Sequence, residues 1–278
     1  AVYVLIPALA PPSASDWDSL AYHLAIPKLY LQHGGFYYID FASHSNFPML
    51  VEMLYLPALS MNEPAGAKMV HYLYGVLLVL AVVMLARKHF SSHAGPPEHP
   101  EPVEGRSGGS KAAPLAALAI AGIPMVMWEA TSAYIDLATA LYTVVAVYLL
   151  LDYLDKPALK PLIWCGVAAG FAASTKMTGL ALIPMLVVWL LIDRLTLVAA
   201  LRRRQPGTEA GHYGQVIRHA LTLAGVGLLV CSPWYVKSII YTGNPVYPFF
   251  YSIFGGKDWT QELAQTYAGL QRQFGVGH

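Results

Sequence analysis

Long apolar runs separated by short charged clusters dominate the sequence. Windows of bilayer length predict a partial first span at 1–12 and six further spans, at 66–86, 112–128, 130–151, 160–174, 177–193 and 217–235. The segments at 160–174 and 177–193 are short for a hydrocarbon core that takes about 20 residues, so we expect tilted or sunken helices there. The pattern predicts an all-α, polytopic transmembrane bundle of about six to seven spans, forming one domain over 1–278.

Composition supports this prediction. The chain is 56% hydrophobic and 12% charged, whereas a soluble domain carries about 25% charged residues. Its net charge of +1 gives no basic field for binding nucleic acid. The two cysteines, Cys165 and Cys231, fall in apolar segments, where we expect small buried hydrophobes and neither a disulfide nor a metal site. Composition therefore excludes a soluble globular domain.

The chain begins without methionine, and its first twelve residues resemble the second half of a spanning helix. No charged segment of a signal peptide precedes them. We therefore expect a chain that is truncated at its start. The family resemblance described below implies that the chain, which ends at His278, is truncated at its end as well.

Lysine and arginine side chains give the orientation. Alternating the spans places eleven on one side, against six on the other: Arg87, Lys88, Arg106, Lys111, Lys156, Lys160, Arg194, Arg202, Arg203, Arg204 and Arg218, against Lys28, Lys68, Lys176, Lys237, Lys257 and Arg272. The richer side is predicted to be cytoplasmic. Residues 13–64 then form a long external loop, and the Pro-, Gly- and Ser-rich residues 89–111 form a disordered cytoplasmic insert.

The external loop contains two apolar stretches. The first is predicted to form a helix that starts near Asp16, breaks at Pro27 and ends at Gly34-Gly35, with Ser15 and Asp18 in a capping-box pattern. The second, 46–64, is followed at once by a span that must end inside. Parity therefore keeps it external, as an amphipathic helix lying in or dipping into the outer leaflet.

Four motifs in this order, D-W-D-S-L-A-Y at 16–22, Y-I-D-L-A at 134–138, S-T-K-M-T-G at 174–179 and P-W-Y-V-K…G-N-P-V-Y-P at 233–248, resemble the GT-C glycosyltransferases. Among these the chain is similar to the bacterial protein O-mannosyltransferase and aminoarabinose-transferase-like family. The resemblance covers nearly the whole chain. It implies transfer of a sugar from a polyprenyl-phosphate donor at the outer face of a bacterial inner membrane.

The resemblance implies a carboxylate in the first external loop as general base. Asp18 stands four residues before Tyr22, the spacing of the family, and is preferred to Asp16. Chemistry agrees, since a hydroxyl or amine attacking an anomeric carbon needs a proton acceptor. Asp18 as a simple helix cap is the alternative. Asp136 matches a second acidic residue that lines the cavity in the family, and an interfacial charge at a helix start is its alternative.

Lys176 is the predicted partner of the lipid phosphate, with hydroxyl donors from Ser174 and Thr175. A snorkelling interfacial lysine is the alternative. Lys237 is a weaker candidate, because Trp234 and Tyr235 beside it favour plain anchoring at the interface. Two more side chains of the first loop helix, Tyr22 and His23, complete the predicted substrate-binding set.

Other histidines carry less information. His23 and His44 share the loop with Asp40 and Glu52 and could bind a divalent cation, but no tight ligand spacing supports a metal site. His71, inside a span, is predicted to hydrogen-bond a neighbouring helix.

The chain departs from the aminoarabinose-type enzymes at Phe47-Pro48, where they carry a basic residue before the proline. The sugar is therefore left open. Two other classes compete with the enzyme: a non-catalytic, transferase-like subunit whose partners are other proteins of a membrane complex, and a transporter. A transporter usually shows repeated halves and broken mid-membrane helices, and neither is visible in the sequence.

Overall fold

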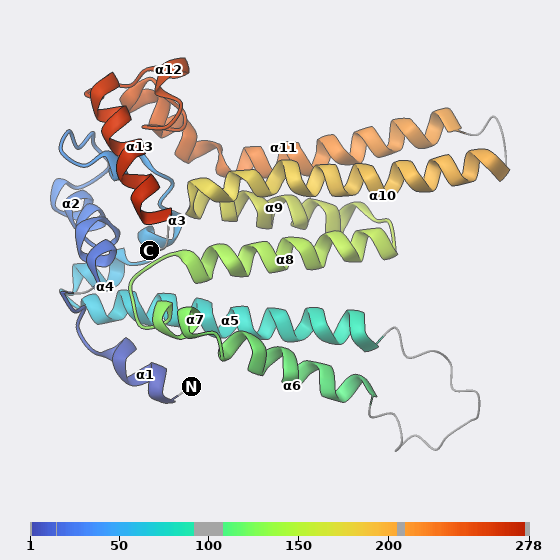
Figure 1. The fold of residues 1–278 in the computed structure, drawn as a ribbon, viewed down its shortest axis with the longest axis horizontal. Coiled ribbons are helices and arrows are strands. Elements are labelled where there is room, and N and C mark those ends of the chain that lie inside the picture. Colours follow the sequence, from blue (N-terminus) through green and yellow to red (C-terminus); the bar gives the residue numbers. More distant parts are fainter. Residues whose placement is uncertain (1, 15, 92–107, 205–208, 276–278) are drawn as a thin grey trace.

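The structure is a computed structural model that describes residues 2–14, 16–91, 108–204 and 209–275, and in these ranges it contains helices and loops but no strand (Figure 1). Four helical segments are long and apolar enough to cross a bilayer: Pro64–Lys88, Asp136–Asp155, Met177–Ala199 and His212–Thr242. The all-α class is confirmed, and the protein is a multi-pass membrane protein with at least these four candidate spans.

The long helices run in alternating directions and, together with the short helices α1 and α7, form two groups. One contains α1 (Val2–Leu9), α5 (Pro64–Ser91), α6 (Gly108–Ala121) and α7 (Pro124–Glu129); the other contains α8 (Asp136–Asp155), α9 (Leu159–Thr175), α10 (Leu182–Arg204) and α11 (Glu209–Thr242). The short elements gather at one end, which we call the site end (Figure 1). They are a π-helical turn (Ser19–His23), α2 (Ala25–His33), α3 (Leu50–Met53), α4 (Leu56–Ser60), α12 (Tyr251–Phe254), α13 (Gln261–Gly275) and the 3₁₀ turns Ser43–Asn46 and Met177–Ala181.

Several predicted boundaries were wrong. The predicted span 112–128 is broken between α6 and α7, because Pro124 lacks the amide hydrogen that a continuous helix requires. The predicted span 130–151 begins six residues later, at Asp136. The segment 177–193 is not short, because α10 continues to Arg204. The first loop helix breaks at Leu24, and Pro27 lies in the first turn of α2, where a missing amide hydrogen costs nothing.

The second apolar stretch of the loop 13–64 lies at the site end and forms two short helices, α3 and α4, where the sequence predicted one. Gly34 ends α2 in the left-handed conformation (φ 81°), as its sequence position predicted. The predicted insert at 89–111 is helical at both of its ends, and its central part, 92–107, lies outside the described residues.

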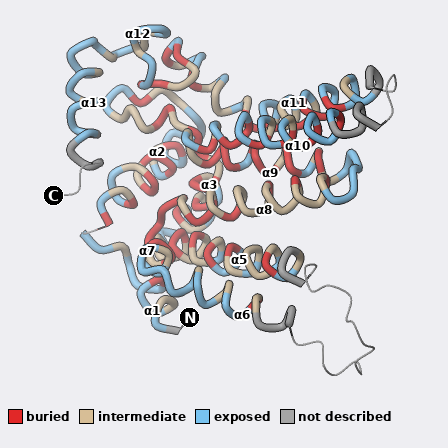
Figure 2. Tube along the Cα trace, turned by 45° about the vertical axis from the view of Figure 1, so that its right-hand side comes forward, coloured by how far each residue is buried: buried red, intermediate tan, exposed pale blue. Residues whose placement is uncertain are grey.

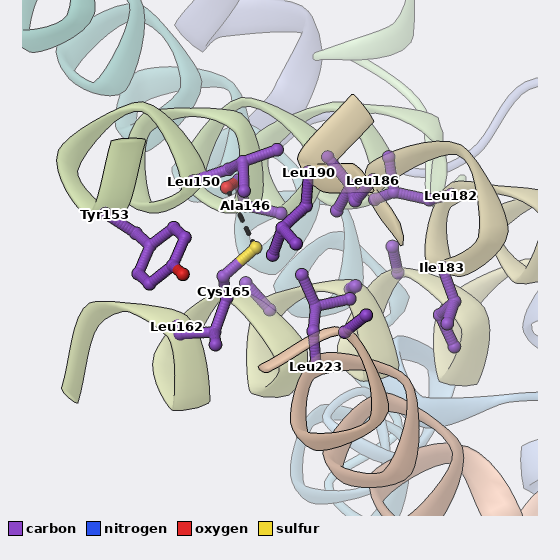
Figure 3. Close-up of a cluster of buried hydrophobic side chains, with 14 of the residues drawn as sticks. Ala146, Leu150, Tyr153, Leu162, Cys165, Leu182, Ile183, Leu186, Leu190 and Leu223 are labelled. Carbon is purple, nitrogen blue, oxygen red and sulfur yellow. Dashed lines mark hydrogen bonds between the residues drawn. The ribbon is translucent and has the colours of Figure 1, made fainter. Parts of the chain in front are cut away.

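The second helix group has a continuous apolar core. Cys165 sits at its centre with Leu150, Leu162, Leu190 and Leu223 around it (Figure 3). The Cys165 thiol donates to the Ala146 carbonyl at 3.3 Å, and both cysteines are buried and unpaired, as predicted. Outside this core many large apolar side chains of the spans are exposed, and Figure 2 shows the exposed and intermediate residues along α5, α10 and α11. Lipid, and not water, is the solvent that such faces require.

The two groups are joined at both ends. The hydroxyls of Tyr74 and Tyr142 are 2.8 Å apart between α5 and α8. At the end opposite the site, Lys88 of α5 and Asp152 of α8 form an ion pair of 2.5 Å. In the first group, the buried Lys68 donates to the carbonyls of Pro7 and Ala10 at 2.7 and 2.8 Å, which holds the end of α1 against α5.

Helices α9 and α11 approach so closely that glycine is required between them. A Cβ atom on Gly170 would lie 2.6 Å from the Cβ of Val230 and 2.7 Å from the carbonyl oxygen of Gly227. Gly166, one turn earlier, meets the Leu223 carbonyl at 2.9 Å in the same way. Such small residues four apart let membrane helices pack backbone against backbone.

Gly170→Leu should therefore force α9 and α11 apart and destabilise the detergent-solubilised protein by about 1–3 kcal/mol, the usual cost of overpacking. Thermal unfolding followed by size-exclusion chromatography measures this. Gly225→Leu is the matched control, because a Cβ atom at that exposed position of α11 meets nothing within 4 Å. Equal stability of the two variants would contradict the close packing.

Candidate active site

A cavity of about 940 Å³ opens at the site end, between the two helix groups and the loops that cover them. Its described lining includes four carboxyl groups, one lysine and two histidines: Asp18, Glu52, Glu129, Asp136, Lys176, His23 and His44. The remaining wall is largely apolar, with Phe47, Met49, Ile135, Leu180 and Phe249 among its side chains. A large apolar pocket with a few convergent polar groups is the usual form of a small-molecule site.

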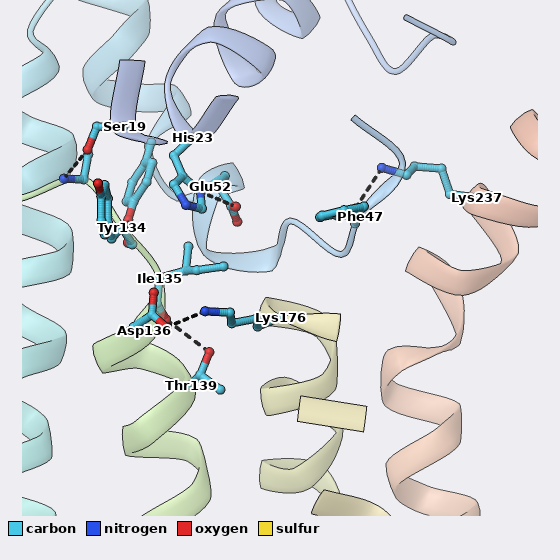
Figure 4. Close-up of polar contacts among 12 residues, drawn as sticks. Ser19, His23, Phe47, Glu52, Tyr134, Ile135, Asp136, Thr139, Lys176 and Lys237 are labelled. Carbon is cyan, nitrogen blue, oxygen red and sulfur yellow. Dashed lines mark hydrogen bonds and ion pairs between the residues drawn. The ribbon is translucent and has the colours of Figure 1, made fainter. Parts of the chain in front are cut away.

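Asp136 and Lys176 form an ion pair in this cavity (Figure 4), with Nζ 2.5 Å from Oδ1. Asp136 is the first residue of α8, where a carboxylate is favoured by the helix dipole, and Lys176 directly follows the last residue of α9. Both side chains keep about two fifths of their surface exposed, 41% and 40%, so ligand has access to them. The structure thus brings together two residues that the sequence singled out separately.

The turn that carries Lys176 is tightly packed. Its amide donates to the Ala172 carbonyl at 3.1 Å, and the Gly179 amide donates to the Lys176 carbonyl at 2.8 Å. A Cβ atom on Gly179 would collide with the backbone of Ala172, so only glycine fits there. The S-T-K-M-T-G motif is therefore a sharp turn that fixes the lysine at the cavity wall.

The hydroxyls of Ser174 and Thr175 are not the phosphate donors that the sequence predicted. Each donates to the carbonyl one helical turn earlier, to Gly170 and Phe171, both at 2.8 Å. This back-bonding within α9 uses the only hydrogen that each hydroxyl has to give.

Asp18 and Tyr22 lie on the cavity side of the first loop helix. Burial raises the pKa of the Tyr22 phenol far above its usual value, and the Asp18 charge, to which the phenol hydrogen-bonds, raises it further. Tyr22 therefore stays neutral and donates to the carboxylate. Its ring also stacks on His44, with centroids 4.5 Å apart and planes 15° from parallel. Burial lowers the pKa of His44, which favours its neutral form in this stack.

His23 and Glu52 form a second polar pair in the wall (Figure 4). Nδ1 of His23 is 2.8 Å from Oε1 of Glu52, and both side chains are almost fully buried. The pair ties the π-helical turn to α3, and its two residues are 29 positions apart in the loop 13–64. The sequence indicated both residues as possible metal ligands, but not as partners of each other.

Glu129 is the cavity residue whose importance sequence reasoning missed. It is the last residue of α7, it is 8% exposed, and its Oε2 atom has no hydrogen-bond partner among the described residues. Burial, and next the Asp136 charge, raise the pKa of Glu129 to about 8 although Lys176 opposes the shift. The sequence contained a signal for this residue. A carboxylate at the end of an apolar segment costs free energy unless it faces a cavity or has a partner.

The irregular backbone between α7 and α8 is held by side chains from other elements. Nδ1 of His71 lies 2.9 and 3.0 Å from the carbonyls of Glu129 and Ser132, and Nε2 accepts from the Leu137 amide at 3.2 Å. The predicted hydrogen bonding of His71 is thus confirmed, with the ring neutral and Nδ1 protonated.

Two side chains of the external loop complete this support. The Ser19 hydroxyl accepts from the Ala133 amide at 3.1 Å, and the Tyr55 phenol donates to the Tyr134 carbonyl at 2.5 Å. Together with His71 they satisfy five backbone groups within residues 129–137, since buried backbone polar groups must be paired.

Two other predicted site residues lie outside the cavity lining. Asp16 is buried and accepts from the Ser13 amide at 3.1 Å. Lys237 donates to the carbonyls of Ser45 and Phe47 at 2.7 and 3.3 Å, with its ammonium 5.0 Å from the centre of the Trp234 ring. These contacts stabilise the loop 13–64, part of which lines the cavity.

The covering segment 243–256 is shaped by the buried Asn244, whose amide group donates to the carbonyls of Phe249 and Gly255, both at 2.9 Å. Its Oδ1 accepts from the Val246 amide at 2.8 Å. This explains the G-N-P-V-Y-P motif, which places Val246 and Phe249 in the wall.

No group of three or more histidine, cysteine, aspartate or glutamate side chains that could hold a metal ion converges within the described ranges.

Comparison with known proteins assigns part of the chain. The profile of the family described as dolichyl-phosphate-mannose-protein mannosyltransferase matches residues 105–205. This stretch, which is less than half of the chain, is similar to that family, whose members are GT-C glycosyltransferases. The matched segment contains Glu129, Asp136 and Lys176 and runs from α6 through α10. No curated protein and no solved structure matches the chain. The expected resemblance to this mannosyltransferase family is thus confirmed over 105–205.

Tyr55→Phe tests the support of the irregular segment. Loss of the phenol leaves the buried Tyr134 carbonyl without its partner, which should cost about 1–3 kcal/mol. The measurement is the thermal unfolding midpoint in detergent, which should fall. Tyr3→Phe, at an exposed position of α1, is the control and should leave it unchanged. If Tyr55→Phe also leaves the midpoint unchanged, the hydrogen bond contributes nothing.

Proposed function

We propose that this protein transfers a sugar from a polyprenyl-phosphate-linked donor to an acceptor at the outer face of a bacterial inner membrane. The observation that carries the proposal is the cavity, which joins the Asp136–Lys176 pair of the matched family segment to Asp18 of the external loop. The family uses lipid-phosphate sugar donors. The acceptor, the side of the membrane and the roles of individual residues belong to the proposal.

Charge pairing supports Asp18 as the general base. Asp136 pairs with Lys176, and Glu52 pairs with His23. Burial keeps Glu129 largely protonated at neutral pH. Among the described lining residues, Asp18 is the carboxyl group left without an ion pair, and it is half-buried, so a substrate can reach it. A carboxylate that has a phenol as hydrogen-bond donor but no cation beside it is suited to accept a proton.

The reaction follows from these positions. The acceptor's hydroxyl or amine attacks the anomeric carbon, its proton passes to Asp18, and the bond from that carbon to the phosphate oxygen breaks. The phosphate leaves with the bonding electrons, and the ammonium of Lys176 stabilises its growing charge. Lys176 is available for this because its side chain is 40% exposed and its partner Asp136 is not fixed by burial. Tyr22 and His23 line the acceptor's side of the same space.

The proposed topology has seven spans. Helix α1, the broken pair α6–α7 and the 17-residue α9 alternate in direction with the four long candidate spans, so each of them crosses or partly crosses the bilayer. The site end then faces outward, because the end of α10 and the loop after α8 carry the excess of lysine and arginine.

Asp18→Asn should reduce sugar transfer by roughly 100-fold or more, the usual effect of removing a general base. The amide keeps the size of the side chain, so thermal stability should change little. Transfer is measured with the full-length protein and its lipid-linked donor. Asp16→Asn is the matched control, since Asp16 lies outside the cavity lining, and should retain transfer.

Two results would contradict this assignment. If Asp16→Asn abolishes transfer and Asp18→Asn retains it, the base is Asp16. If both variants and wild type transfer equally, the loop is structural, and the alternative function, a non-catalytic subunit of a membrane complex, gains support.

The topology is tested by cysteine labelling from outside. Asp40→Cys, at the site end, should react with an impermeant maleimide in intact cells, and Ala158→Cys, between α8 and α9, should react only after permeabilisation. Both positions are exposed, and the native Cys165 and Cys231 are buried and should stay silent. Labelling of both variants in intact cells would overturn the proposed orientation.

A further inference from the structure

We propose that Glu129 is held as a neutral carboxylic acid that donates a hydrogen bond to a phosphate oxygen of the lipid-linked donor. This inference rests on the proposed function and adds a donor-binding residue to it. Glu129 lies in the cavity wall, more than nine tenths buried, and its Oε2 atom has no partner among the described residues. A buried polar atom without a partner in a ligand-sized cavity points to a ligand.

The position of Glu129 is fixed through its backbone. Its carbonyl accepts from Nδ1 of His71 at 2.9 Å and from the Ser132 amide at 3.0 Å. The side chain therefore starts from a rigid point, and its short reach keeps the carboxyl group at the wall. A residue that only filled space here would need no carboxyl group, since burying one without a partner costs stability.

The charges around Glu129 favour its neutral form. The carboxylates of Asp136 and Asp18 oppose ionisation, and Lys176 favours it; His71, which is neutral, contacts the backbone only. Because burial adds to the repulsion, the pKa of Glu129 rises to about 8. At neutral pH the group is thus mainly a hydrogen-bond donor.

A phosphate explains why a protonated acid is useful at this place. The described lining offers one ammonium group against four carboxyl groups, so an anion entering the cavity meets repulsion from every carboxylate that is ionised. A neutral Glu129 removes one negative charge and supplies a donor, and a hydrogen bond to a charged acceptor is the stronger kind. A sugar hydroxyl would not discriminate in this way, because it can donate to the ionised acid as well as accept from the neutral one.

Binding and protonation must then be coupled. The phosphate binds the protonated form, so its affinity should fall as the pH rises through the pKa of Glu129, and binding should raise that pKa further. The second ionisation of a phosphate monoester, near pH 6, is complete before this range. Tyr22 and Tyr134 also face the cavity, but burial raises the pKa of both phenols, so neither ionises in the same range.

Undecaprenyl phosphate is the probe, and its equilibrium binding to the full-length protein in nanodiscs is measured between about pH 7.5 and 9.5, above the titration of the phosphate. Wild-type affinity should fall by about tenfold across this range, as expected for one proton linked to binding. Glu129→Gln keeps a neutral donor of the same size, so it should bind like the wild type at pH 7.5 and lose the pH dependence. Glu129→Ala should bind about tenfold more weakly at pH 7.5.

Glu63→Gln is the control, because Glu63 is exposed outside the cavity, and it should titrate like the wild type. The inference is overturned if wild-type affinity does not change with pH, or if Glu129→Gln keeps the wild-type pH dependence. Tight, pH-independent binding would leave the proposed function standing without this role of Glu129. Failure of the folded wild-type protein to bind the probe at any pH would instead refute the donor class, and the inference with it.

A sugar hydroxyl as the true partner gives a different result. Undecaprenyl phosphate would then bind equally to wild type and to all Glu129 variants, and only a sugar-carrying donor would separate them. That outcome counts against the phosphate contact. Should Glu129→Gln fail to fold, Glu129→Ala decides the question, because it too should lose the pH dependence that the wild type shows.

Discussion

The irregular backbone between α7 and α8 is the constraint on which the rest of the site depends. Residues 132–135 of this segment are buried, so their amides and carbonyls need protein partners. Three side chains supply them: His71 from α5, Ser19 from the π-helical turn and Tyr55 from the loop before α4. Since the partners come from separate parts of the chain, satisfying this backbone also docks the loop 13–64 on the helix bundle. The cavity is what remains between them.

The same docking brings carboxyl groups together, which creates an electrostatic problem. Like charges in an apolar cavity repel, and each must find a counter-ion or a proton. Asp136 has Lys176 and Glu52 has His23, while Glu129 keeps its proton. The compensation differs for each group, and this gives them different chemical capacities. Asp136 is an anion beside an accessible cation, Glu52 belongs to a buried pair, Glu129 is a buried acid, and Asp18 is the carboxyl group for which we propose the role of base.

The sequence was sufficient for what depends on hydropathy and local chemistry. It predicted the all-α class, the four long candidate spans with ends up to seven residues off, the left-handed end of α2 at Gly34, and Asp136 and Lys176 as polar groups at helix ends. It failed where a contact partner decides the outcome. Apolar residues at 130–135 read as the start of a span, because their tertiary hydrogen bonds leave no mark on hydropathy. Ser174 and Thr175 read as ligand donors, because nothing in sequence reveals back-bonding within a helix.

Helix length explains how residues 40 positions apart meet at the Asp136–Lys176 pair. Helix α8 has 20 residues and α9 has 17, so the chain descends about 30 Å and returns about 25 Å through a short connection. The two helix lengths bring Lys176 back to the level of Asp136, and the close packing of α8 on α9 around Cys165 brings the two side chains within reach of each other.

This hairpin lies wholly within the segment that matches the mannosyltransferase family. Asp18, His23 and Glu52 do not, since they precede residue 105. The matched segment thus contains the Asp136–Lys176 pair and Glu129, whereas Asp18 and the His23–Glu52 pair belong to the loop 13–64. Because His71, Ser19 and Tyr55 all hold the backbone between α7 and α8, a defect in that segment would shift Asp18 relative to Lys176 without touching either one.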